Sequence, residues 1–138
     1  MTTVQVRQVA GLELEGVGAV RTLAIDLAPG RGGRGAGFEP GELLLLALGG
    51  CMIHNMKIFA DRNDIALTGV AAEVAAEDAE TAPKRLGTIR IRFRLEGALT
   101  SEDEARLLRV ASHCKIHNTL TSPPAFEVAV DRGMLHDR

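Results

Sequence analysis

The sequence predicts an α+β fold with a mainly antiparallel sheet, and two observations support this class. Segments in which apolar and polar residues alternate, as in half-buried strands, occur in the first 28 residues, around residues 67–97 and near the C-terminus. Two segments of helical character, residues 39–64 and 100–118, separate them. The resulting order of strands, helix, strands, helix and strand favours α+β architecture over repeated βαβ units.

Length and composition predict a single globular domain over residues 1–138. The chain is 46% hydrophobic and 25% charged, which is ordinary for a folded protein. Its net charge of −2 gives no general attraction to nucleic acid or acidic membranes. With four Phe and neither Trp nor Tyr, the chain also has few side chains on which bases could stack. We therefore expect no nucleic-acid partner and no membrane partner.

The N-terminal residues do not resemble a secretory signal, because no basic region followed by an apolar stretch occurs there. The longest uncharged apolar run, residues 43–53, is well short of the ~20 residues that span a bilayer. Two cysteines without an export signal are unusual as a structural disulfide, since the cytosol keeps thiols reduced. The sequence therefore predicts a cytoplasmic protein.

The strands are expected on the basis of alternation. The first 28 residues contain several short alternating runs, and a loop rich in Gly and Pro follows over residues 29–37. The segment 87–97 is the clearest strand, with one apolar face and one arginine-rich face. The segment 123–133 predicts a last strand that closes the domain.

The first helix is expected to be buried and central. Pro40 suits the first helical position, and the acidic Glu42 suits the positive end of the helix dipole. From Leu43 onward the segment is apolar all round, which predicts burial on every side. Because one sheet covers only one side of a helix, the sequence predicts an intimate homodimer with this helix near its centre.

The second helix is expected to run unbroken over residues 100–118. Ser101 and Glu104 have the spacing of a capping box. Leu107, Ala111 and Cys114 follow the spacing of one helical face, which predicts that Cys114 faces the core.

The only two cysteines stand in matching pentapeptides, CMIHN from Cys51 and CKIHN from Cys114. Two cysteines with His54 and His117 supply the atoms of a Cys2His2 zinc site. However, structural zinc usually stabilises small domains that lack a core. We therefore predict no metal ion and no other cofactor.

Two further interpretations of the cysteines remain open. Free cysteine is among the most buried residue types and is often inert packing. Alternatively, Cys51 and Cys114 form a dithiol, which requires only that the two sulfur atoms lie close together. One thiol can then react with an electrophilic oxygen, and the second can displace the product to form a disulfide.

The stretch PGELLLLALGGC, which begins at Pro40, and the later HCKIHNTL, which begins at His113, resemble the OsmC/Ohr family of organic-hydroperoxide-reducing proteins. The resemblance extends from about Leu23 to Val130. It implies an OsmC-like α+β fold that forms an intertwined homodimer, with antioxidant activity and a role in stress response. It also implies hydrophobic peroxide substrates and a dithiol reductant of the dihydrolipoyl type.

By this resemblance, Cys51 matches the peroxidatic cysteine and Cys114 the resolving cysteine. The chain departs from the family where a Glu directly follows the proline, because Gly41 stands there and Glu42 comes one position later. Arg31, Arg34 and Glu42 are the candidates for activating the Cys51 thiolate. The alternative function is a relative without peroxidase activity that binds a small apolar or sulfur-containing ligand at the dimer interface.

Overall fold

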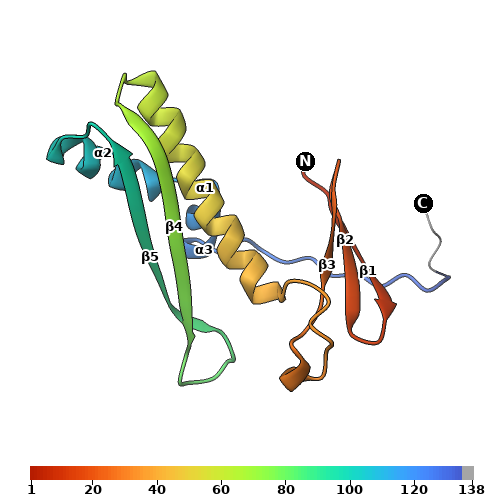
Figure 1. Cartoon of the computed structure of the whole chain (residues 1–138). Coiled ribbons are helices and arrows are strands. Elements are labelled where there is room, and N and C mark those ends of the chain that lie inside the picture. The colour runs from red at the N-terminus through yellow and green to blue at the C-terminus, as the bar shows by residue number, and fades with distance from the viewer. Residues whose placement is uncertain (135–138) are drawn as a thin grey trace.

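The structure is a computed structural model that describes residues 1–134. Within this range, two separate antiparallel sheets and three α-helices form the fold, and the N-terminal sheet stands apart from the other elements (Figure 1). In chain order the elements are β1 (Gln5–Ala10), β2 (Glu13–Val17), β3 (Thr22–Ile25), the 3-10 helix η1 (Pro29–Arg31), α1 (Pro40–Arg62), β4 (Leu67–Asp78), β5 (Leu86–Gly97), α2 (Ser101–Ala111) and α3 (Lys115–Thr121). The α+β class with antiparallel strands is confirmed.

The N-terminal sheet is a meander in which β2 pairs with both β1 and β3. Gly11 turns the chain between β1 and β2 with φ of 56°, a conformation that glycine adopts without strain. No residue of this sheet belongs to the hydrophobic cluster that the structure describes around α1. Several large apolar side chains in and beside the sheet are therefore exposed: Val4, Val6, Val9, Leu12, Val20 and Leu23.

The glycine-rich segment between β3 and α1 is folded around Asp26. One carboxylate oxygen of Asp26 accepts hydrogen bonds from the backbone N–H groups of Arg34 and Ala36, both at 3.0 Å. The bond from Ala36, followed by that from Arg34, lowers the pKa of Asp26. Gly33 passes so close to Leu27 that an added Cβ would lie 2.0 Å from its carbonyl oxygen. The segment is thus an anchored loop.

Helix α1 begins at Pro40, as predicted. The helix start is a capping box in which the side chain of Glu42 accepts the backbone N–H of Glu39 at 2.8 Å, and the Glu39 side chain accepts the N–H of Glu42 in return. Within the single chain only one stripe of this helix is buried: Leu48, Gly49, Met52, Met56 and Ala60. Burial on every side depends on a second subunit and stays a prediction. Leu46 remains 55% exposed.

By length and composition alone, α1 is the one helix within residues 1–134 that could cross a membrane. Core helices of soluble proteins pass the same test. The cytoplasmic location predicted from the sequence stays a prediction.

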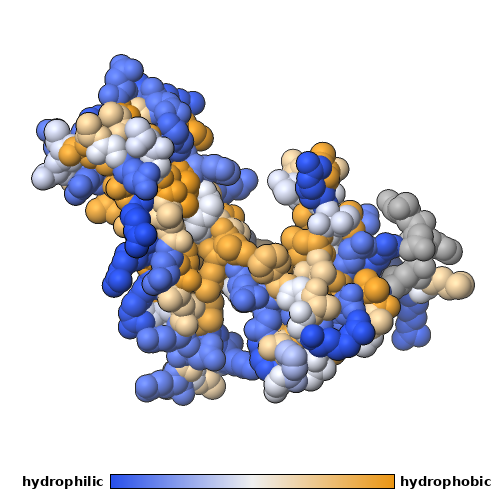
Figure 2. Space-filling view, in the orientation of Figure 1, coloured by the Kyte–Doolittle hydropathy of each residue, from blue (hydrophilic) through white to orange (hydrophobic). Residues whose placement is uncertain are grey.

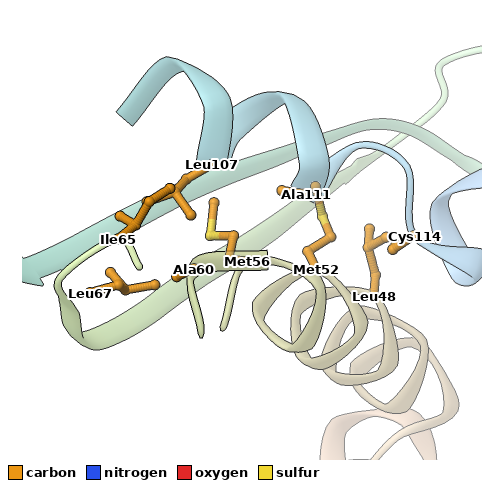
Figure 3. Packing of buried hydrophobic residues seen from close by; sticks show 9 residues of the cluster. All are labelled: Leu48, Met52, Met56, Ala60, Ile65, Leu67, Leu107, Ala111 and Cys114. Atoms are coloured by element: carbon orange, nitrogen blue, oxygen red, sulfur yellow. The ribbon is translucent and has the colours of Figure 1, made fainter. Parts of the chain in front are cut away.

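Strands β4 and β5 form a long hairpin that covers one side of α1 (Figure 1). The predicted alternation in β5 is confirmed, since its apolar residues are half-buried whereas Arg90, Arg92 and Arg94 are exposed. Val70 and Val74 of β4 join these apolar residues against the core. The hydrophobic cluster shown in Figure 3 lies between α1, the hairpin and α2, and consists of Leu48, Met52, Met56, Ala60, Ile65, Leu67, Leu107, Ala111 and Cys114.

The predicted second helix is divided into two, which corrects the expectation of one helix over residues 100–118. Helix α2 is capped by Thr100 and Asp103, one position earlier than the predicted pair of Ser101 and Glu104. The break falls before Cys114, whose backbone is extended with φ of −78° and ψ of 152°. Cys114 is nevertheless fully buried in the core, as predicted.

The predicted last strand at residues 123–133 is also wrong for the single chain, since no strand occurs there. Its alternating apolar residues Phe126, Val128 and Val130 are 84%, 92% and 83% exposed. Alternation indicates an extended segment with one apolar side, but a strand also needs a neighbouring strand that accepts and donates its hydrogen bonds. No such neighbour lies beside this segment in the described chain.

Candidate active site

The two cysteines come from different elements and both are free thiols. Cys51 lies in the middle of α1 and is half-buried, whereas Cys114 directly precedes α3 and is fully buried. The Cys114 sulfur caps α3 by accepting the backbone N–H of His117 at 3.3 Å. Helices α1 and α3 are in contact, so the fold brings two distant segments of the sequence together.

Cys51 and Cys114 lie in the same packed region of the fold, since Cys51 packs against the hydrophobic cluster to which Cys114 belongs. Burial raises the pKa of the Cys114 thiol above its ordinary value, the N–H of His117 lowers it, and the neighbouring Cys51 raises it again. The fold thus places both thiols at one cluster, as dithiol chemistry requires.

A groove of about 450 Å³ runs along the N-terminal half of α1 beside β4. Its lining is mainly apolar and includes Phe38, Leu46, Gly50, Ile53 and Val74, with Glu42 as its charged residue. Gly50 immediately precedes Cys51 in the sequence, and within residues 1–134 no atom from outside the local helix backbone lies within 4 Å of where its Cβ would be. The groove offers an apolar ligand a place on the same helix that carries Cys51.

Of the three candidate activating residues, both arginines hold carboxylates in this structure. Arg31 contacts Glu39 at 3.1 Å, and Arg34 forms an ion pair with Glu13. Glu42 accepts the N–H of Glu39 while its side chain lines the groove. The structure thus places Glu42 at the groove and both guanidinium groups in ion pairs of the preceding loop.

The two pentapeptides place their histidines differently. His54 is exposed on α1, whereas the Nδ1 atom of His117 is buried and has no hydrogen-bond partner among the described residues. Over residues 1–134, no three or more His, Cys, Asp or Glu side chains gather in a way that could hold a metal ion. Sequence reasoning treated the histidines alike, and no signal in the matching pentapeptides distinguishes them.

The sequence analysis also did not identify Asp26 as the residue whose carboxylate holds the glycine-rich loop. Its position directly before a glycine-rich loop was the available signal, because such a loop offers many free backbone N–H groups.

Solved structures with the same fold come from several bacteria. A putative osmotic stress induced and detoxification response protein from Psychrobacter arcticus is 24% identical, with a TM-score of 0.78 over 86% of this chain and 88% of that chain. An OsmC like protein from Mycoplasma pneumoniae is 16% identical, with a TM-score of 0.79 over 89% of both chains. An organic hydroperoxide resistance protein OsmC from Legionella pneumophila is 19% identical, with a TM-score of 0.67 over 87% and 88%.

At these identities the structural likeness shows the fold alone. No curated protein sequence matches the chain. The sequence pattern of the family described as OsmC-like protein, however, matches residues 32–129, which is most of the chain and includes both cysteines. This protein therefore belongs to the OsmC-like family.

Proposed function

We propose that this protein is a thiol-dependent peroxidase that reduces organic hydroperoxides through Cys51 and Cys114. The observation that carries the proposal is that Cys51 of α1 packs against the hydrophobic cluster that contains Cys114, at the start of α3. The Legionella relative of the same fold is named an organic hydroperoxide resistance protein, which supports the choice of substrate.

The reaction needs only the two thiols, the peroxide and a reductant. The Cys51 thiolate attacks the distal peroxide oxygen, the O–O bond breaks, and the alcohol leaves with a proton while Cys51 becomes a sulfenic acid. The Cys114 sulfur then attacks the Cys51 sulfur, water leaves, and a disulfide forms. A dithiol of the dihydrolipoyl type returns both cysteines to thiols by exchange.

The groove on α1 supports an apolar substrate. Its lining by Phe38, Leu46 and Ile53 suits an alkyl or aromatic group, and its volume of about 450 Å³ is within the usual range of small-molecule sites. Glu42 is positioned to contact the polar end of a ligand in this groove. Activation of Cys51 by Arg31 or Arg34 requires that guanidinium to exchange its present carboxylate partner for the sulfur.

We also propose that the active form is a homodimer in the cytoplasm. Figure 2 shows hydrophobic surface over the lower half of α1, on the side that faces the N-terminal sheet. Leu46 on α1, Val6 on β1 and Val128 near the C-terminus are all more than half exposed. Such extensive exposed apolar surface is unusual for a soluble monomer and indicates an interface. A second copy would cover α1 on the sides that this chain leaves open.

The decisive experiment is turnover of cumene hydroperoxide with dihydrolipoamide as the reductant. Wild-type protein should turn over, and a single equivalent of peroxide should convert Cys51 and Cys114 into one intramolecular disulfide. Cys51→Ser should abolish turnover. Cys114→Ser should react once and then stall or overoxidise. A wild-type Cys51 that stays unmodified in the folded protein would end the peroxidase proposal.

The second candidate function is binding of a small apolar or sulfur-containing ligand without turnover. It is favoured by Gly41, which stands where the peroxidases of the family have Glu, and by the engagement of Arg31 and Arg34 in ion pairs. Under this alternative, apolar ligands should bind the groove with Cys51 intact. Saturable binding without thiol loss during peroxide treatment distinguishes it from the first candidate.

A further inference from the structure

His54 and His117 each stand three residues after a cysteine, and of these two histidines His117 is the partly buried one. Its backbone N–H lies 3.3 Å from the Cys114 sulfur. Its ring atom Nδ1 is buried and has no hydrogen-bond partner among the described residues. His54, three residues after Cys51, is exposed instead. A buried polar atom without a partner requires a reason, and a role in chemistry is one of the recognised reasons.

The tautomer of His117 follows from this environment. A buried N–H without an acceptor is rarer and costlier in proteins than an acceptor without a donor. The proton of the neutral ring therefore belongs on Nε2, which leaves a lone pair on the covered Nδ1. His113 shows the opposite arrangement, because its Nδ1 lies 2.7 Å from the carbonyl oxygen of Arg109 and must donate to it. The lone pair of His117 is thus an unused base on the residue whose backbone N–H contacts the Cys114 sulfur.

The resolving step needs such a base. Burial raises the pKa of the Cys114 thiol, so the sulfur keeps its proton at neutral pH and is a poor nucleophile until that proton leaves. In the described part of the chain, the groups that influence this thiol are Cys51 and the backbone N–H groups of His117 and Ile116. Of these three residues, His117 is the one that carries a basic side chain.

We propose that His117 is the proton acceptor for Cys114 when Cys114 attacks the sulfenic acid of Cys51. This inference rests on the peroxidase function proposed above. In this step the Cys114 proton passes to Nδ1 of His117, the S–S bond forms, and the S–O bond of Cys51 breaks. The departing hydroxide takes the proton from His117 and leaves as water, so the ring is ready for the next cycle. The Cys114 sulfur is oxidised, and the Cys51 sulfur is reduced from the sulfenic to the disulfide level.

The geometry requires a small movement. Nδ1 has no hydrogen bond to either sulfur in this state, so the imidazole must turn toward Cys114 or use one intervening water molecule. Catalytic hydrogen bonds are often absent before the reacting state forms. Conversion of Cys51 to a sulfenic acid replaces the thiol that raises the pKa of Cys114, and the movement of the imidazole is needed at that stage.

The test is a single-turnover experiment on the full-length reduced protein with one equivalent of cumene hydroperoxide. Trapping with dimedone and mass spectrometry measure formation of the Cys51 sulfenic acid, and loss of both thiols measures disulfide formation. In His117→Gln, the first rate should stay within about twofold, whereas the second should fall on the order of 100-fold, the size typical of general base catalysis. In His117→Ala, added imidazole should restore part of the second rate. His54→Gln is the matched control and should leave both rates unchanged.

Each outcome has a defined meaning. Disulfide formation at the wild-type rate in His117→Gln overturns the proposal. A slower rate in His117→Ala that imidazole does not raise also overturns it, because a merely structural role predicts that result. If wild-type Cys51 forms no sulfenic acid at all, the peroxidase function itself fails and this inference falls with it. The two failures are distinguished by the dimedone adduct of the wild-type protein.

Discussion

Gly49 of α1 lies directly against Val74 of β4, so closely that a Cβ at Gly49 would be 2.9 Å from a methyl carbon of Val74. The helix and the hairpin therefore approach each other at a point where only a hydrogen atom fits. Gly50, the next residue, has open space where its Cβ would be. Both glycines line the groove, but only Gly49 is also required by the close contact between α1 and β4.

Alanine substitutions separate these two roles. Gly50→Ala should stabilise the protein by about 1 kcal/mol, because alanine favours a helix over glycine by that amount. Gly49→Ala has the same helical gain, but the stiff side chain of Val74 must move, and overpacking of this kind costs roughly 1–3 kcal/mol. Urea unfolding of both variants checks this. Equal stabilisation by the two substitutions would mean that α1 and β4 are not packed as described.

Asp26→Asn should destabilise the protein at neutral pH and change its behaviour in acid. The pKa of Asp26 is lowered by backbone N–H groups, first that of Ala36, so the charged form stabilises the fold above the ordinary pKa of 3.8. This contribution is lost as the pH falls through the lowered pKa. The difference in unfolding free energy between wild type and Asp26→Asn should therefore shrink as the pH falls from about 7 to about 3. Asp131→Asn, at an exposed carboxyl group, is the control and should show no such convergence.

Cys114 should make the reduced protein less stable in base. Its pKa is raised above the ordinary value of 9.0, chiefly by burial, so the folded state binds the thiol proton more tightly than the unfolded state. The associated stability is fully present below that ordinary value and is lost as the pH rises toward the raised one. Urea unfolding under reducing conditions between about pH 8 and pH 10 should show this decline. In Cys114→Ala, which lacks the thiol, the decline should be smaller; an identical pH dependence would contradict the burial of Cys114.

The exposed alternating segment near the C-terminus should belong to the dimer interface. Light scattering should give a mass near twice the 14.7 kDa of one chain. Val128→Glu should shift the equilibrium toward monomer, since Val128 is 92% exposed in the single chain and has no other partner there to lose. Glu127→Gln changes the neighbouring residue and should leave the mass unchanged. A wild-type mass of one chain at micromolar concentration would contradict the homodimer.

Most of the fold was predictable because its signals are local. The alternation in β5 and the N-terminal start of α1 at Pro40 come from side-chain periodicity and capping chemistry, and both are confirmed. The break before Cys114 was not predictable, because the helical spacing of Leu107, Ala111 and Cys114 holds whether or not the chain changes direction. The absent last strand has a similar cause, since periodicity at Phe126 describes one segment and says nothing about its neighbour.

The candidate site was predictable in its residues and only partly in its environment. The matching pentapeptides singled out Cys51 and Cys114, and the fold packs Cys51 against the cluster that contains Cys114. Their roles as a reactive pair stay a prediction. The ion pairs of Arg31 with Glu39 and of Arg34 with Glu13 depend on how the loop folds back on itself. That path is set by the hydrogen bonds that the carboxylates of Asp26 and Glu39 accept from the loop backbone, which no spacing rule reveals.

The anchored loop has a consequence for the molecule as a whole. The N-terminal sheet contributes nothing to the hydrophobic cluster around α1, so side-chain packing does not orient it. Instead, Asp26 at the end of β3 holds Arg34 and Ala36, while the Glu39 carboxylate at the start of α1 holds the N–H of Ala28 at 2.9 Å. These polar contacts fix the conformation of the loop that joins the N-terminal sheet to α1. The angle at which the sheet is presented to another subunit is thus encoded in one loop.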